Sequence, residues 1–204
     1  CTSYGSGVRH IWYLSLYRNN LQGTIPSSIA DLNNLQLLQL TSNFLSGTIP
    51  EEVFSLSDLL LIDLQSNKLT GTIPDQIGKL SNLTSLYLNN NELSGTIPEG
   101  IGASKGIVGL ALSSNSLTGR IPASIWQLSA MTTLYLSRNC FEDSGLPDSS
   151  YFESMPELSL FATSSCLTGT VPSGICDIKA YSISGNQFSC PLPACCTLGC
   201  GRCV

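Results

Sequence analysis

A repeat of constant length constrains this chain more than any other feature of its sequence. Glycine follows four residues after each of the first five repeated asparagines and opens a Gly-x-Ile-Pro segment. Self-similarity at a fixed period predicts a solenoid of stacked turns. Toward the C-terminus the period loosens, since Pro147 and Pro172 stand slightly further apart than one repeat and Pro172 and Pro193 slightly closer. The evenly spaced asparagines are Asn19, Asn43, Asn67, Asn91, Asn115 and Asn139.

Apolar residues keep fixed positions inside each repeat. In the fourth copy they are Leu80, Leu83, Leu86 and Leu88. The alternation at residues 86–88 predicts a short strand whose leucines face inward. Stacking about eight such turns at ~4.8 Å gives a rod roughly 40 Å long with a continuous core. The proline that follows favours a short helical segment in each turn, for example over residues 27–32 and 75–80.

The repeated asparagine stands where the chain leaves the strand, at a point where backbone groups lose their ladder partners. We expect a stacked row of these amides to bond the backbone inside the turns. The row is interrupted once, where Ser165 takes the asparagine position. Because the register slips there, we expect a bulge or a widened turn over residues 142–151.

The segment LTSLYLNNNELSGTIPEGIG (residues 83–102) resembles the plant-type leucine-rich repeat, LxxLxxLxLxxNxLSGxIPxxIG, and the resemblance covers about residues 8–193. It implies an α/β solenoid: a right-handed superhelix of about eight turns, with a parallel β-sheet on the concave face and short 3-10 or helical segments on the convex face. It also implies a second set of short strands near Gly-x-Ile-Pro. Members of this family include receptor ectodomains, polygalacturonase-inhibiting proteins and an antifreeze protein.

The resemblance also suggests the organisation of the ends. Residues 1–193 form the solenoid, and residues 194–204 form a Cys-rich C-terminal cap or tail, because QFSCPLPACC resembles the cap of plant repeats. Most of the family's N-terminal cap is missing. We therefore expect the cap to precede this segment or to belong to another chain.

The cysteines predict disulfides in an oxidising, extracellular setting. Cys140 and Cys166 follow equivalent positions of adjacent turns, about 5 Å apart, so we expect them to be linked. Cys1 is then left over, and we expect its partner outside this segment. The tail would close through the others, with connectivity left open, and zinc at the tail is a weaker alternative. These remaining cysteines are Cys176, Cys190, Cys195, Cys196, Cys200 and Cys203.

Composition and motifs exclude several classes of function. Charged residues make up 11% of the chain and the net charge is −5, which disfavours nucleic acid and anionic lipid as partners. No apolar run is long enough to insert directly into a membrane. His10 is the only histidine, and nucleotide or metalloprotease motifs are absent, so we expect no enzyme, no cofactor and no metal site. Asn82-Leu83-Thr84 is an N-glycosylation sequon, so a secreted glycoprotein is expected.

Alternate strand residues point out of the concave sheet, and aromatic side chains are frequent among them. We expect a shallow groove between Tyr87 and Tyr135, across Gly109 and Ala111. The ligand would be uncharged or weakly basic, because Asp63 is the only acid in these columns. The alternative is that tyrosine and phenylalanine merely favour strands and pack across turns. The expected ligand-binding residues are Trp12, Tyr13, Tyr17, Gln39, Asp63, Gln65, Tyr87, Asn89, Tyr135 and Phe161.

These observations favour a non-enzymatic extracellular module that recognises another protein or a glycan through its concave face. The first alternative is a structural or accessory subunit of an extracellular filament, wall or larger complex, with homo- or hetero-assembly. The second is ice binding, because threonine recurs in the Gly-x-Ile-Pro segments and would form flat ranks of hydroxyls. That column holds Thr24, Thr48, Thr72, Thr96 and Thr170.

Overall fold

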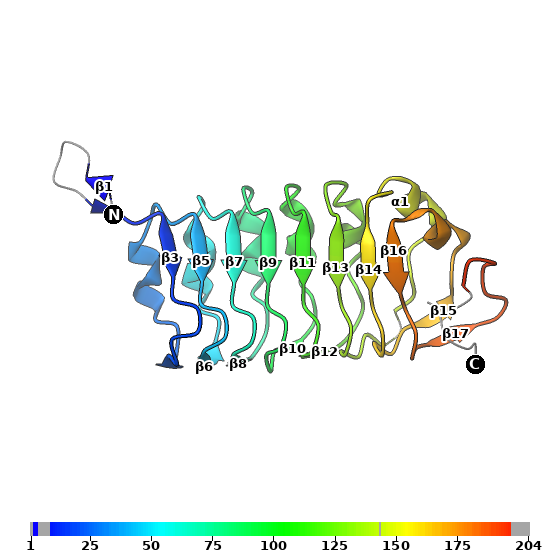
Figure 1. Ribbon diagram of the computed structural model, residues 1–204, viewed down its shortest axis with the longest axis horizontal. Coiled ribbons are helices and arrows are strands. Elements are labelled where there is room, and N and C mark those ends of the chain that lie inside the picture. The colour runs from blue at the N-terminus through cyan, green and yellow to red at the C-terminus, as the bar shows by residue number, and fades with distance from the viewer. Residues whose placement is uncertain (1, 4–8, 143, 197–204) are drawn as a thin grey trace.

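The computed structural model describes residues 2–3, 9–142 and 144–196, and its central element is one parallel sheet of eight strands (Figure 1). The strands follow one another across the sheet in sequence order, as a solenoid requires. In order, they are β3 (Tyr13–Ser15), β5 (Leu37–Gln39), β7 (Leu61–Asp63), β9 (Ser85–Tyr87), β11 (Gly109–Ala111), β13 (Thr133–Tyr135), β14 (Ser159–Phe161) and β16 (Ala180–Ser182).

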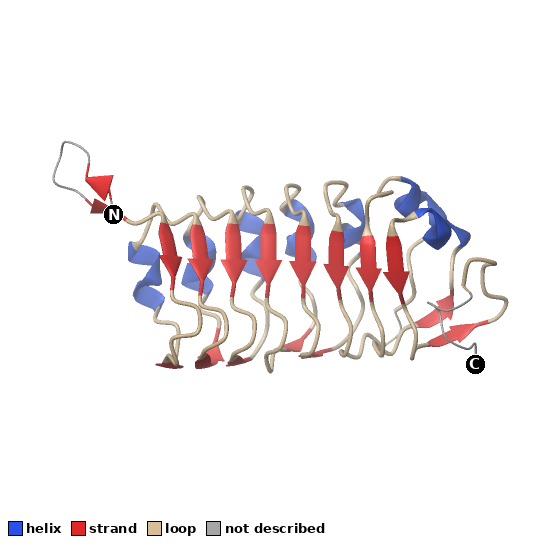
Figure 2. Cartoon of the chain, viewed as in Figure 1, coloured by secondary structure: helices blue, strands red, loops and turns tan. Residues whose placement is uncertain are grey.

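A second set of short strands lies near the Gly-x-Ile-Pro segments, along one edge of the rod (Figure 2). This confirms the expectation drawn from the plant-type repeat. These strands are β4 (Gln22–Gly23), β6 (Phe44–Thr48), β8 (Lys68–Thr70), β10 (Ser94–Gly95), β12 (Ser116–Leu117), β15 (Thr168–Thr170) and β17 (Gln187–Ser189). At the N-terminal end, β1 (Thr2–Ser3) pairs with β2 (Arg9–His10) in an antiparallel hairpin.

Short 3-10 helices cover the opposite side of the sheet (Figure 2), and each begins directly after a proline, as the sequence predicts. They are η1 (Ser27–Asp31), η2 (Glu51–Ser55), η3 (Asp75–Lys79), η4 (Glu99–Ala103), η5 (Ala123–Gln127) and η6 (Ser173–Asp177). The irregular turn instead holds the α-helix α1 (Ser149–Glu153). Phe152 of α1 is buried and meets Trp126 edge-on, with ring centroids 6.1 Å apart. The widened turn is therefore confirmed. No bulge interrupts the neighbouring strands, because Thr133 pairs with Ser159 in register.

The inward leucines and isoleucines form one continuous core along the rod. Leu80, Leu83, Leu86 and Leu88 of the fourth repeat are all fully buried. The strand there spans residues 85–87 rather than the expected 86–88. The difference is small, because the amide of Leu88 still donates to a carbonyl of the next turn, 2.8 Å away.

The repeated asparagines bond the backbone inside the turns, as expected. Asn91 shows the pattern: its Nδ2 donates to the carbonyls of Leu64 and Leu88, each at 3.0 Å. Its Oδ1 accepts the amide of Leu69 at 3.1 Å. From Asn43 onward, each amide therefore joins its own turn to the preceding one, which explains why this position needs both a donor and an acceptor.

The glycine of Gly-x-Ile-Pro is required by two local features. At Gly71 the backbone φ is +77°, a conformation that costs a residue with a Cβ. A Cβ there would also lie 2.7 Å from the γ-methyl of Thr48 in the preceding turn. The threonine methyl of one turn thus rests on the glycine of the next, and the same contact recurs at Gly47, Gly95 and Gly119.

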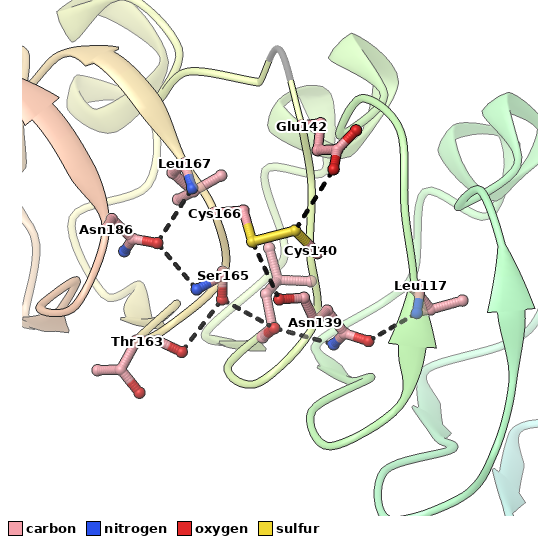
Figure 3. The surroundings of a disulfide bond; sticks show 10 residues. Leu117, Asn139, Cys140, Glu142, Thr163, Ser165, Cys166, Leu167 and Asn186 are labelled. Carbon is pink, nitrogen blue, oxygen red and sulfur yellow. Dashed lines mark hydrogen bonds between the residues drawn. A yellow bond between two sulfur atoms is a disulfide. The ribbon is translucent and has the colours of Figure 1, made fainter.

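The disulfide between Cys140 and Cys166 is present, with Cα atoms 4.8 Å apart (Figure 3). It joins the two turns at the point where the asparagine row is interrupted. Ser165 there donates its hydroxyl to the Leu136 carbonyl, and its amide donates to Asn186 Oδ1. The disulfide therefore reinforces a turn in which a shorter side chain replaces the amide.

A further disulfide joins Cys176 to Cys195, and Cys190 and Cys196 are also disulfide-bonded. Zinc binds cysteine as a thiolate, and a disulfide-bonded sulfur is not one. The zinc alternative is therefore wrong for Cys195 and Cys196. Cys1, Cys200 and Cys203, with the expectations attached to them, lie outside the described residues. Within the part of the chain that the structure describes, no helix has the length and hydropathy of a membrane span.

Candidate functional site

The side chains that follow the central core residue of each strand form one row across the outer face of the sheet, called here the concave face. Register pairs connect Gln39 to Asp63, Asp63 to Tyr87, and Tyr87 to Ala111. The row continues through Tyr135 to Phe161. Parallel strands lie about 4.8 Å apart, so these side chains stand at regular intervals along the rod.

A shallow groove of about 500 Å³ lies between Tyr87 and Tyr135, where the sequence predicted one. We call it the aromatic groove. Small residues at its centre leave room between the two tyrosines. Its lining is Gln65, Tyr87, Asn89, Ala111, Ser113, Thr133 and Tyr135.

Both tyrosines are held in place by neighbours on the sheet. A Cβ at Gly109 would lie 2.9 Å from the hydroxyl of Tyr87, so the phenol of Tyr87 leans over the backbone of that glycine. Tyr135 stacks on Phe161, with centroids 4.9 Å apart and planes inclined by 22°. One side of the Tyr135 ring is therefore occupied by Phe161.

A second concavity of about 340 Å³ adjoins the aromatic groove toward the N-terminus. We call it the polar hollow. Gln65 lines both concavities, so they share a wall. The lining of the polar hollow is Tyr17, Arg18, Gln39, Thr41, Ser42, Asp63, Gln65 and Ser66.

A chain of side-chain hydrogen bonds runs along this shared wall. Asn89 Nδ2 donates to Gln65 Oε1 at 3.2 Å, and Gln65 Nε2 donates to Asp63 Oδ2 at 3.2 Å. The amide of Gln65 also donates to Asp63 Oδ1, at 3.3 Å. Asp63 is only 5% exposed although it lines the hollow. The buried carboxylate is thus oriented by Gln65, which is itself oriented by Asn89.

Most of the residues expected from the sequence meet in these two concavities. Tyr17, Gln39, Asp63, Gln65, Tyr87, Asn89 and Tyr135 line one or both of them. Phe161 supports Tyr135 from the side. Trp12 and Tyr13 do not line either one. They are exposed by 43% and 64% at the edge strand β3 and its approach.

The expected binding residues omit Thr41 of the polar hollow, and they also omit a group of three further lining residues, Arg18, Ser42 and Ser66. Each of these three has a positive φ, between 54° and 57°, just after its strand. They too recur at the constant interval of the repeat. That spacing could have identified them as a further column beside the strands.

A third concavity, of about 630 Å³, lies on the Gly-x-Ile-Pro edge rather than on the sheet. We call it the threonine hollow. Thr48, Thr72 and Thr96 line it together with the prolines of the same turns and with Glu51, Asp75 and Gln76. Gln76 Nε2 donates to Glu51 Oε2 across neighbouring turns, at 2.7 Å.

Comparison with known proteins places this geometry among leucine-rich repeats. Two family profiles, both described as leucine-rich repeat, match residues 38–93 and 10–32. The plant peptide hormone receptor RGFR1 in complex with RGF2 has a similar structure, with 34% identity and a TM-score of 0.81, over 88% of this chain and 29% of that one.

Two further structures are similar. The Arabidopsis receptor kinase HAESA, in complex with the peptide hormone IDA and the co-receptor SERK1, has 28% identity and a TM-score of 0.81, over 88% of this chain and 30% of that one. A plant ice-binding protein has 29% identity and a TM-score of 0.70, over 90% of this chain and 67% of that one. No curated protein sequence matches. The chain spans about a third of the length of the receptor structures, for instance 32% of a TDR receptor. Its disulfides and its likeness to ectodomains agree with the extracellular location expected from the sequence.

Proposed function

We propose that this chain, a leucine-rich-repeat protein of the plant type, is a recognition module that binds an extended segment of another protein along its concave face. The observation that supports this most is the pair of adjoining concavities, which offers two tyrosines and a row of polar side chains over neighbouring strands. Tyrosines with polar tips are frequent anchors of protein contacts.

The lining of the site favours binding over catalysis. The ionisable side chains of the two concavities are Asp63, Arg18 and tyrosines, with no histidine or cysteine among the lining residues. Nucleophilic or acid–base catalysis needs a base within hydrogen-bond reach of a nucleophile. His10 contacts Asn34 through its ring and does not line either concavity. We therefore assign no reaction to the site.

A peptide fits the concavities better than a glycan. Sugar rings stack on free aromatic faces, whereas one face of the Tyr135 ring is covered by Phe161 and the ring of Tyr87 leans over Gly109. An extended peptide instead needs concavities for its side chains at intervals, with polar groups between them. The two concavities provide the first, and Gln65 and Asn89, which lie between them, provide the polar groups. Solved structures of similar fold hold the peptide hormone IDA or RGF2.

The proposal is tested by pull-down from the extracellular fluid of the source organism with three baits. They are the wild-type chain, Tyr87→Ala/Tyr135→Ala, and Thr48→Ala/Thr72→Ala. The expected result is a protein whose affinity falls at least about tenfold with the tyrosine variant, as for interface anchors, and is unchanged with the threonine variant. Loss with the threonine variant alone would place the working surface on the Gly-x-Ile-Pro edge and refute the proposal.

Ice binding is a second candidate, favoured by the threonine column and by the likeness to an ice-binding protein. Thr24, Thr48, Thr72 and Thr96 are exposed. The methyl of each would lie 2.7–2.9 Å from a Cβ on the glycine of the next turn, so the four side chains share one orientation. An ice-recrystallisation assay tests this: inhibition lost with Thr72→Lys and kept with Tyr135→Ala would support it. No inhibition by the wild type would exclude it.

A further inference from the structure

The carboxylate of Asp63 is buried in the polar hollow and forms no ion pair with a described side chain. It is 5% exposed, yet among the described residues its hydrogen bonds come only from the amide and side chain of Gln65, at 3.3 and 3.2 Å. These distances are at or beyond the usual limit for an N–H donor, and charge-assisted bonds are normally shorter. A carboxylate has about four acceptor positions, so capacity remains for stronger donors.

No cationic side chain among the described residues satisfies that capacity. In the described residues the one ion pair is Lys179 with Glu157, far along the chain from Asp63. Arg18 lines the same hollow, but no guanidinium nitrogen of Arg18 lies within 4.0 Å of the carboxylate. Burial of an unpaired carboxylate is costly, and the cost is recovered when a cation enters and bonds to it.

We infer that the polar hollow takes the lysine or arginine side chain of a peptide ligand, while an apolar side chain of the same peptide enters the aromatic groove. This inference rests on the proposed function and specifies its ligand. The carboxylate of Asp63 accepts the cationic head, and Gln39 and Thr41 line the path of the aliphatic stem. The ring of Tyr87 leans toward Gly109, away from the strand of Asp63, and leaves the hollow open on that side.

The spacing of the strands sets the spacing of the two ligand residues. Asp63 belongs to β7, and Ala111, at the centre of the aromatic groove, belongs to β11 two strands further on. Two strand spacings are about 10 Å, and an extended peptide rises about 3.3 Å per residue. The basic and apolar residues of a ligand that runs along the rod are therefore about three positions apart.

The charge of the chain supports a basic ligand. The net charge is −5, which attracts cationic segments at low ionic strength. The aromatic groove has no charged lining residue, so it offers no competing site for the cation. Arg18, which also lines the polar hollow, disfavours a second positive charge next to the first and so limits the ligand to a single basic residue there.

The test is an array of acetylated and amidated peptides of about nine residues, which span the two concavities when extended. One position holds Lys, Arg, norleucine or Glu, and a second holds Phe, Leu or Ser at each separation from one to five residues. Wild-type protein, Asp63→Asn and Asp58→Asn are compared. Asp58 is an exposed carboxylate in the turn before β7, so its substitution changes the net charge equally and leaves the hollow intact.

The inference predicts selection of Lys or Arg about three residues from Phe or Leu, with norleucine in place of Lys weakening binding roughly 10- to 100-fold. That preference disappears in Asp63→Asn and persists in Asp58→Asn. If Asp63→Asn does not fold, as judged by circular dichroism, the wild-type protein still tests the inference, because equal binding of the Lys and norleucine peptides would refute it.

Three other outcomes overturn it. Peptides that bind with a preference for Phe or Leu over Ser but with no preference for a basic residue would refute the inference and leave the proposed function standing. A basic preference that Asp63→Asn retains would place the cation elsewhere. Failure of every peptide to bind would overturn the inference together with the proposed peptide recognition.

Discussion

Replacing Asn91 by alanine is the sharpest test of how the turns are held together. Its side chain makes three hydrogen bonds, at 3.0, 3.0 and 3.1 Å, to backbone groups of two turns. The carbonyls of Leu64 and Leu88 keep a second donor, because Asn67 and Asn115 also bond to them. The amide of Leu69 keeps no alternative partner among the bonds of the asparagine row.

The loss of unfolding free energy in Asn91→Ala therefore has two contributions of different size. An orphaned buried N–H costs about 1–3 kcal/mol, and each of the two shared bonds contributes about 0.5–1 kcal/mol. The sum is about 2–5 kcal/mol, of which a value near 3 kcal/mol is expected after partial relaxation. With a urea m-value of about 3 kcal/mol/M, the unfolding midpoint falls by about 1 M.

The assay is urea unfolding followed by circular dichroism, with Asn19→Ala as the matched control. Asn19 holds the same repeat position in the first turn, but it is exposed, and within the described chain its side chain donates only to the Tyr17 carbonyl, at 3.0 Å. The free energy of unfolding of Asn19→Ala should be less than about 1 kcal/mol below that of the wild type. Equal losses at the two positions, or a loss below about 1 kcal/mol at Asn91, would show that the asparagine row does not hold the stack as described.

Three further predictions concern the glycine column, the disulfide and the sequon. Gly71→Ala should lower the free energy of unfolding in urea by about 2–3 kcal/mol, because the alanine adopts a positive φ and its methyl group meets that of Thr48. Gly23→Ala should lower it by only about 1 kcal/mol, because a Cβ there has no atom within 4 Å and only the positive φ is unfavourable. Cys140→Ala/Cys166→Ala opens a loop with a sequence separation of 26 and should lower stability by about 3.5 kcal/mol on the chain-entropy estimate; an unchanged midpoint would contradict it. Asn82 is exposed, so secretion from eukaryotic cells should add a glycan that a glycosidase removes, and Asn82→Gln should show no such mass shift; an unmodified wild-type chain would count against it.

The period of the repeat was enough to predict the fold, because the strand register, the buried residues and the asparagine row all recur with it. The constant spacing fixes which residues face each other across the sheet: Leu38 pairs with Ile62, and Ile62 with Leu86. A slip by one residue would turn those side chains to the solvent, so the burial pattern determines the register. The same reasoning located the disulfide, since Cys140 and Cys166 follow equivalent positions.

The details of the site depend on conformations that the period does not encode. The lean of Tyr87 over Gly109 depends on a rotamer, and the burial of Asp63 depends on Gln65 bending back toward it. The first is a contact between neighbouring turns and the second is a contact within one turn, and both depend on side-chain conformations that a repeat pattern does not specify.

Hydroxyl-radical footprinting tests the concave site most directly, because it reports which side chains a bound partner covers. Tyr135, 38% exposed, stands on the wall of the aromatic groove, and Phe44, 48% exposed, stands on β6 along the Gly-x-Ile-Pro edge. With the captured protein bound at saturation, the oxidation rate of Tyr135 should fall severalfold and that of Phe44 should stay unchanged. Protection of Phe44 with no change at Tyr135 would contradict recognition through the concave face.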